Sequence, residues 1–187
     1  EQLGWELPDA VVAPIASGAM YSKVHQGFTE LLELGLVEGR SPRLVGGQAE
    51  GCAPVATAFA DGGRVKPVKP NTVARSIAIG SPADGDLAVA TANASGGAIH
   101  AVPEEEIAEN IRLLAETTGV FGETAPAAAL GALREAVRRG ELGGQDRVVL
   151  LVTGDGLKTP ALVADRFDPV RVEPDADLIL ERLGVPA

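Results

Sequence analysis

The sequence predicts an α/β protein with three layers, in which a mostly parallel sheet carries helices on both faces. Short apolar runs alternate along the chain with segments whose apolar residues recur every three or four positions, as in strands followed by helices. Alanine, valine and leucine are abundant and aromatic residues make up only 3% of the 187 residues, which favours helices packed closely on a sheet. An apolar run at 149–152 also delivers a polar, glycine-rich turn, which is typical of the strands of such sheets.

The first third of the chain predicts two strands, each followed by a helix. Residues 11–15 form a short apolar run, and the small residues at 16–19 lead from it into a helical pattern. The apolar positions of that helix are Val24, Phe28, Leu31, Leu32 and Leu36. Residues 42–48 are the second predicted strand, and the alanine-rich segment 53–60, which ends before a glycine pair, is a short helix.

The rest of the chain continues this alternation. A proline-punctuated connector leads to two short helices, after which three strands alternate with two longer helices. The connector is 65–70, the short helices are 72–79 and 86–94, the strands are 98–102, 120–121 and 148–152, and the longer helices begin at Pro103 and span 127–137. Acidic residues after Pro103 suit the positive end of a helix dipole, and the run at 149–152 predicts a buried strand.

We expect one α/β domain over residues 1–164 and a carboxyl-terminal extension over residues 165–187. The extension contains prolines and then a short amphipathic helix with the apolar residues Leu178, Ile179 and Leu183. Such a helix has two places to bury these side chains, the core of the domain or a partner subunit.

Charge and composition exclude several classes of function. The formal charge is −10, from 16 basic and 26 acidic side chains without a basic cluster, so nucleic acid is not an expected partner. No apolar run is long enough to cross a membrane and the first residues do not resemble a signal peptide, so we expect a cytoplasmic protein without a membrane partner. Two distant histidines and one cysteine give no spacing for a metal site, and Cys52 is expected to be a core thiol.

Two polar turns that follow predicted strands are the candidate binding elements, because ligands bind beyond the carboxyl ends of parallel strands. The first turn consists of Ala16, Ser17, Gly18, Ala19 and Met20. Its small residues let backbone N–H groups converge at the start of a helix, which suits a phosphate. An ordinary turn between a strand and a helix has the same composition, so this turn alone does not decide between the two interpretations.

The second turn begins with Thr153, whose hydroxyl a rigid strand places where a ligand would lie. The same turn contains the Lys158 and Thr159 pair that a nucleotide-binding P-loop requires. That loop also requires glycine at the positions that Val152 and Leu157 occupy, which excludes a nucleoside triphosphate site.

Four groups of residues follow one another in a specific order between positions 1 and 160. They are PIASG at 14–18 before GF at 27–28, PR at 42–43 leading to QAEG at 48–51, Thr72 and Ala74 leading to IGSP at 79–82, and TGDGLK at 153–158. Together they resemble the threonine synthases, pyridoxal-phosphate enzymes with the tryptophan-synthase-β-like fold, which is also called fold type II.

The resemblance implies that the chain is part of the large domain of such an enzyme and that its cofactor is pyridoxal phosphate. It implies that the backbone of the 16–20 turn binds the cofactor phosphate and that Thr153 faces the pyridine nitrogen. A threonine hydroxyl can hydrogen-bond an unprotonated ring nitrogen but does not stabilise a full pyridinium charge as a carboxylate does. Ala16, Ala19 and Met20 stand where the wider family often has glycine or asparagine, which favours backbone contacts over asparagine contacts.

The implied reaction of the whole enzyme converts O-phosphohomoserine and water to threonine and phosphate, with a phosphorylated amino acid as substrate and a homodimer as assembly. The family attaches its cofactor through a Schiff-base lysine in an N-terminal part that has no counterpart here, so we expect a fragment that is inactive alone. Three alternatives stay open: a related lyase such as threonine dehydratase or cysteate synthase, a half that pairs with a separate chain, and a non-catalytic binding or regulatory remnant.

The ionisable residues near the predicted site have structural interpretations beside the functional ones. The lysines are Lys23, Lys66, Lys69 and Lys158, and none matches the position of the family's Schiff-base lysine, so solvated or structural roles are expected. Glu50, Glu123 and Asp155 have helix capping or solvent contact as the alternative to a functional role. Glu123 is a candidate for ordering the ring-nitrogen end of the site through hydrogen bonds.

Overall fold

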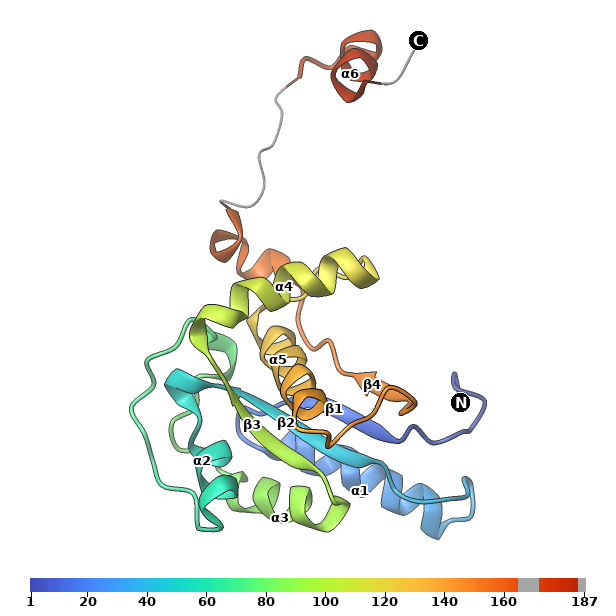
Figure 1. Cartoon of the computed structure of the whole chain (residues 1–187), viewed down its shortest axis with the longest axis vertical. Coiled ribbons are helices and arrows are strands. Elements are labelled where there is room, and N and C mark those ends of the chain that lie inside the picture. The colour runs from blue at the N-terminus through green and yellow to red at the C-terminus, as the bar shows by residue number, and fades with distance from the viewer. Residues whose placement is uncertain (165–171, 185–187) are drawn as a thin grey trace.

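The computed structural model describes residues 1–164 and 172–184 and contains one parallel sheet of four strands (Figure 1). The strands are β1 (Ala10–Pro14), β2 (Arg43–Ala49), β3 (Ala98–Val102) and β4 (Val148–Leu150), in the spatial order β3-β2-β1-β4. Ala10 of β1 lies in register with Arg43 on one side and with Val148 on the other. The predicted α/β class with a parallel sheet is confirmed.

Helices cover both faces of the sheet and make three layers (Figure 1). One face carries α1 (Ala19–Glu33), α2 (Pro54–Asp61) and α3 (Gly85–Ser95), and their core includes Tyr21, Leu44 and Ile99. On the other face α5 (Thr124–Arg138) lies directly on the strands, and α4 (Glu104–Thr118) packs against α5.

Small side chains let α5 approach the sheet closely. Ala127, Ala128, Ala129 and Ala132 are all fully buried on this helix. A Cβ atom at Gly47 of β2 would lie 2.4 Å from the carbonyl oxygen of Ala128, so the backbones of the strand and the helix are nearly in contact. The low aromatic content of the chain therefore reflects close packing of alanine and glycine between the layers.

Two predicted elements of the middle of the chain are wrong. The helix expected at 72–79 is irregular backbone with a single 3₁₀ turn, Arg75–Ile77, because the Val73 amide and the Ser76 hydroxyl bond to carboxylates of other segments. The strand expected at 120–121 is not formed, since only Gly122 makes an isolated antiparallel bridge, with Asp155.

The last strand is shorter and less buried than predicted. β4 covers three residues at the edge of the sheet, all three half-buried, whereas the sequence predicts a buried strand at 149–152. Only β1 pairs with β4 within the described residues, so Val149 and Leu151 keep partly exposed side chains.

The carboxyl-terminal extension contains the predicted helix, α6 (Ala176–Leu183), which Asp175 caps through the amides of Asp177 and Leu178. The side chains of Leu178 and Ile179 are 45% and 36% exposed, so neither is buried against the core. The third predicted apolar side chain, that of Leu183, and residues 165–171 lie outside the described part of the chain. The domain boundary at 164 stays a prediction.

The described segments show neither a cluster of metal-binding side chains nor a helix suited to a membrane. Within residues 1–164 and 172–184, no three His, Cys, Asp or Glu residues gather as metal ligands. Among the same residues, no helix is both long enough and apolar enough to cross a bilayer.

Cys52 is a core residue, as predicted, and its thiol is expected to be unreactive. The residue is 2% exposed, and burial of the thiol, together with the negative charge of Glu104, raises the pKa of Cys52. Because the thiolate is the reactive form, we expect a disulfide reagent at pH 8 to modify the native chain on the order of a hundredfold more slowly than the chain in denaturant. Equal rates in the two conditions at the same pH would contradict this assignment.

Candidate functional site

The carboxyl ends of β1 and β4 meet at a cavity of about 260 Å³. Five of the six predicted site residues line it, and the sixth, Ala19, does not; the lining residues are Pro14, Ala16, Ser17, Gly18, Met20, Tyr21, Ser76, Ile77, Glu123, Ala125, Thr153 and Lys158. Two turns that are more than a hundred residues apart in the sequence therefore share one site.

The first turn ends at the amino terminus of α1. Gly18 is the residue before the helix and has a left-handed backbone with φ of 95°. The Ala19 amide donates to the Ser17 hydroxyl at 3.3 Å, but the amides of Gly18, Met20 and Tyr21 have no acceptor among the described residues. Free N–H groups and the positive end of the helix dipole are features that favour an anion at this end of the cavity.

The turn is held from behind by the start of α3. The Asp84 amide donates to the Ser17 carbonyl at 2.9 Å, and a Cβ atom at Gly18 would lie 2.5 Å from the Asp84 carbonyl oxygen. A residue larger than glycine therefore does not fit at position 18. The positive φ of this position would strain such a residue as well.

A buried amide side chain fixes the strand that leads into the turn. Gln48 is fully buried and donates through Nε2 to the Ile15 carbonyl at 3.3 Å. Its Oε1 accepts from the amides of Val55 at 2.9 Å and Ala56 at 3.1 Å, which begin α2. Gln48 thus ties β2, the end of β1 and the first turn of α2 together.

The second turn, which begins at Thr153, is anchored by the segment before α5. The Gly154 carbonyl accepts from the Glu123 amide at 3.0 Å, and the Gly156 amide donates to the Phe121 carbonyl at 2.8 Å. The Thr153 side chain is exposed and lines the cavity. Asp155 accepts from the Leu157 amide at 2.8 Å, which is the capping role considered as its structural alternative.

Glu123 places a carboxylate in the wall of the cavity, although it is only 3% exposed. Its Oε2 accepts from the hydroxyls of Ser76 at 2.9 Å and Thr124 at 3.0 Å. Ser76 belongs to the segment 72–79, for which the sequence predicted a helix, so sequence reasoning did not place it in the site. Glu50, for which the sequence also left a functional role open, is exposed and does not line the cavity.

Of the four lysines, only Lys158 lines the cavity. Lys23 donates to Gln26 at 2.6 Å on the surface of α1, and Lys66 and Lys69 are exposed in the connector, which confirms their solvated roles. Lys158 is exposed as well, but its position gives the cavity a cation opposite in charge to Glu123.

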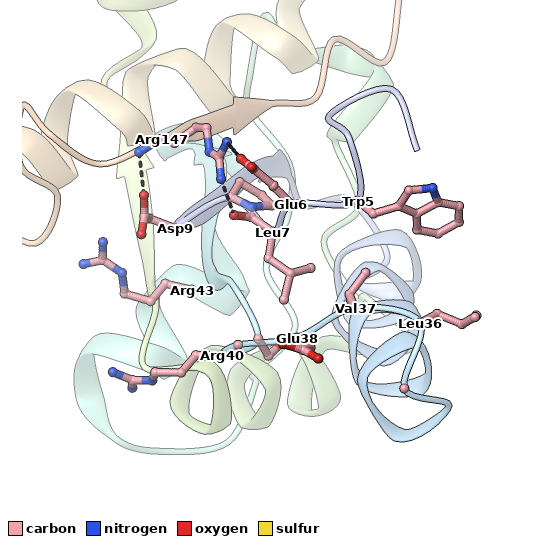
Figure 2. A pocket seen from close by; sticks show the side chains of 14 residues that line it. Trp5, Glu6, Leu7, Asp9, Leu36, Val37, Glu38, Arg40, Arg43 and Arg147 are labelled. Atoms are coloured by element: carbon pink, nitrogen blue, oxygen red, sulfur yellow. Dashed lines mark hydrogen bonds and ion pairs between the residues drawn. The ribbon is translucent and has the colours of Figure 1, made fainter.

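A larger hollow of about 800 Å³ lies at the opposite ends of the strands, beside Trp5 and three arginines (Figure 2). Arg147 donates to Glu6 at 2.7 Å and to the Leu7 carbonyl at 3.0 Å, and Arg43 pairs with Asp146 at 2.9 Å. These guanidinium groups join the segment before β1 and the start of β2 to the start of β4, and we assign the hollow no function.

Comparison with known proteins agrees with the architecture and with the motifs. Residues 1–154 match the family model described as "Pyridoxal-phosphate dependent enzyme". A threonine synthase from Methanocaldococcus jannaschii is 34% identical over 182 residues, covering 96% of this chain and 45% of the relative. A threonine synthase from Mycobacterium bovis is 36% identical, covering 95% and 48% of the two chains.

Solved structures of similar fold include an L-serine ammonia-lyase from Rhizomucor miehei, with a TM-score of 0.65 and 25% identity over 82% of this chain and 47% of that one. Maize serine racemase aligns with a TM-score of 0.65 at 19% identity, over 85% and 48% of the two chains. The chain spans about half the length of the curated relatives it matches. The family model matches residues 1–154, which are most of this chain, and this match shows that the chain belongs to the family of pyridoxal-phosphate dependent enzymes.

Proposed function

We propose that this chain is the carboxyl-terminal, cofactor-binding part of a threonine synthase that converts O-phosphohomoserine and water to threonine and phosphate. The observation that supports this most is the shared cavity, in which the free amides at the start of α1 and the Thr153 hydroxyl both lie. The identity to threonine synthases over nearly the whole chain favours this activity within the family.

The groups around the cavity fit pyridoxal phosphate. The amides of Gly18, Met20 and Tyr21 would hold the phosphate, since they are unpaired within the described residues and lie at a helix amino terminus. Thr153 would contact the ring nitrogen from the other side. The volume of about 260 Å³ lies just below the range for small-molecule sites, roughly 300–1,000 Å³.

When bound, pyridoxal phosphate supplies an electron sink for elimination and replacement at the side chain of an amino acid. The residues of this chain would orient the ring, since both turns are fixed by backbone hydrogen bonds to neighbouring segments, Ser17 to Asp84 and Gly154 to Glu123. We place the lysine that carries the cofactor outside this chain, in a segment that corresponds to the N-terminal half of the relatives.

An apolar groove beside the edge strand supports the proposal that a further segment of the protein covers this surface. A groove of about 280 Å³ runs beside β4 and α1, where its walls include Leu3, Trp5, Phe28, Val149 and Leu151. All three residues of the edge strand β4 are apolar and only half-buried. Another segment normally covers such an edge in a complete protein. The homodimer belongs to the proposal through the resemblance alone, and the cytoplasmic location through the sequence pattern alone.

A second candidate is a related lyase or racemase of the same fold. The similarity to L-serine ammonia-lyase and serine racemase structures favours it, because these proteins share the arrangement of the sheet and helices. Assays of the protein with the upstream segment on O-phosphohomoserine, threonine and serine would separate these activities. We expect phosphate release from O-phosphohomoserine, without ammonia release from threonine or serine and without racemisation of serine.

Cofactor binding is expected to require the upstream segment. We would add pyridoxal phosphate to this chain alone and to the chain joined to the upstream segment of its gene, record the absorbance spectrum, and reduce with borohydride before mapping the modified peptide. A reducible adduct on a lysine of the upstream segment is expected only in the joined protein. An adduct on Lys158 in the isolated chain would contradict the proposed division of the site, and a folded joined protein without cofactor would favour a non-catalytic remnant.

A further inference from the structure

Glu104 joins two backbone segments at the carboxyl ends of β2 and β3. Its Oε1 accepts from the Gly51 amide at 2.9 Å, and its Oε2 accepts from the Val73 amide at 2.9 Å. Gly51 follows β2 closely, and Glu104 is the first residue of α4, which follows β3. Because both carboxylate oxygens bond to other segments, Glu104 fixes the path along which the connector between α2 and α3 passes these strand ends (Figure 1).

The two segments that Glu104 holds also touch each other directly. The Asn71 amide donates to the Gly51 carbonyl at 2.9 Å. A Cβ atom at Gly51 would lie 1.9 Å from the Asn71 carbonyl oxygen and 2.9 Å from Oε1 of Glu104, so the contact requires glycine. These three hydrogen bonds form a latch. The two that end on the carboxylate are its strong members, because bonds to an ionised acceptor are roughly twice as strong as neutral ones.

The latch lies close to one wall of the cavity. Ser76 and Ile77 line the cavity and follow Val73 within four residues of the chain. Ile77 is 5% exposed and belongs to the core on the α5 face of the sheet, so the link is packed and cannot absorb a shift freely. A movement of Val73 is therefore transmitted to Ser76, whereas the two turns of the site are held separately, by backbone bonds of Ser17 and Gly154.

We propose that Glu104 is a positioning residue of the site, which holds Val73 and thereby sets the place of Ser76 and the affinity for the phosphorylated amino-acid substrate. The inference rests on the proposed function. Glu104 does not line the cavity, so it acts on a bound molecule only through the wall that contains Ser76. Its loss is expected to weaken substrate binding with little effect on the later chemical steps, because the two turns stay in place.

The test compares Glu104→Gln with Glu105→Gln in the joined protein. Glutamine keeps the size of the side chain but has one acceptor oxygen instead of two, so one of the two amides loses its partner. For Glu104→Gln we expect the KM for O-phosphohomoserine to rise about five- to twentyfold, with kcat changed by less than about twofold. Glu105 is exposed and has no partner among the described residues, so removing the same charge from the same helical turn is expected to leave KM unchanged.

Hydrogen exchange measures the latch itself, without any substrate. In the joined protein, the peptide that covers residues 71–78 is expected to exchange about tenfold faster in Glu104→Gln than in the unmodified protein, because an amide that held the segment is free. Glu105→Gln is expected to leave this rate unchanged. Equal exchange rates in all three proteins would show that Glu104 does not hold the segment.

A double substitution separates positioning from a general loss of stability. If Glu104 acts through the place of Ser76, adding Glu104→Gln to Ser76→Ala is expected to change the logarithm of KM by less than half as much as Glu104→Gln does alone. If Glu104→Gln does not fold, Glu104→Asp, which keeps the charge on a shorter side chain, is expected to show a smaller shift of the same kind. Additive effects with Ser76→Ala, or equal KM values for the variants at 104 and 105, would overturn the inference. A folded, unmodified joined protein without turnover of O-phosphohomoserine would overturn the proposed function instead.

Discussion

Replacing Gly18 by valine is expected to disrupt the proposed anion site at the start of α1 more than any other single substitution in the turn. The backbone of Gly18 has φ of 95°, a conformation that a β-branched residue strongly disfavours. The new Cβ atom would also lie 2.5 Å from the carbonyl oxygen and 2.8 Å from the carbonyl carbon of Asp84. Strain and overpacking together predict a loss of about 2–5 kcal/mol in the free energy of unfolding.

The same substitution is expected to weaken pyridoxal-phosphate binding, because the free amides of Met20 and Tyr21 depend on the direction in which Gly18 starts the helix. A titration of the joined protein that follows cofactor fluorescence should show at least about a tenfold rise in Kd, which corresponds to 1.4 kcal/mol.

Gly27→Ala is the matched control. Gly27 lies within the same helix, and a Cβ atom there meets nothing within 4 Å, so alanine is expected to stabilise α1 by about 0.5–1 kcal/mol without an effect on cofactor binding. Equal effects of the two substitutions on Kd would show that helix stability, and not the Gly18 turn, controls the site.

Gln48→Leu is expected to cause the second large loss, this time of stability. Leucine matches the side chain approximately in size but cannot bond to the Ile15 carbonyl or to the amides of Val55 and Ala56. Because Gln48 is fully buried, water cannot replace these partners, and each unsatisfied group costs about 1–3 kcal/mol. Allowing for the long bond to Ile15, we expect a fall of about 2–5 kcal/mol in the free energy of unfolding, measured in urea.

Gln26→Leu supplies the control for this change. Gln26 is exposed on α1 and its side chain bonds to Lys23 and Glu30, so the same exchange of amide for leucine should change stability by about 0.5 kcal/mol or less. A small effect at position 48 as well would mean that the first turn of α2 has other hydrogen-bond acceptors in solution.

The sequence predicted the two turns of the site because both follow strands, and parallel strands end at one edge of a sheet. Apolar runs at 11–15 and 148–152 were enough to place Ser17 and Thr153 at the same edge. The third wall of the cavity, from the loop at Ser76, was not predictable in this way. Its conformation depends on Glu104, which accepts from the Val73 amide at 2.9 Å, and on Glu123, both distant in sequence.

The burial of β4 was also beyond local reasoning. A run of valine and leucine indicates a strand that packs on apolar groups, but it does not show whether one neighbour or two flank that strand. Here β4 is at the edge of the sheet, and its three residues are only half-buried. The segment 120–121 shows the same limit, since two apolar residues lack the length for a strand unless a partner aligns with them.

The pairing of β1 with β4 also determines the order in which the molecule can assemble. The Arg147 amide donates to Asp9 at 2.7 Å across 138 positions of sequence, and the contact closes the largest loop in the sheet. Contacts between distant residues form late, because the entropy of the intervening chain opposes them. During synthesis on the ribosome, the helices that flank β2 and β3 can therefore collapse first, and the cavity between the two turns forms only after residues beyond 153 have emerged.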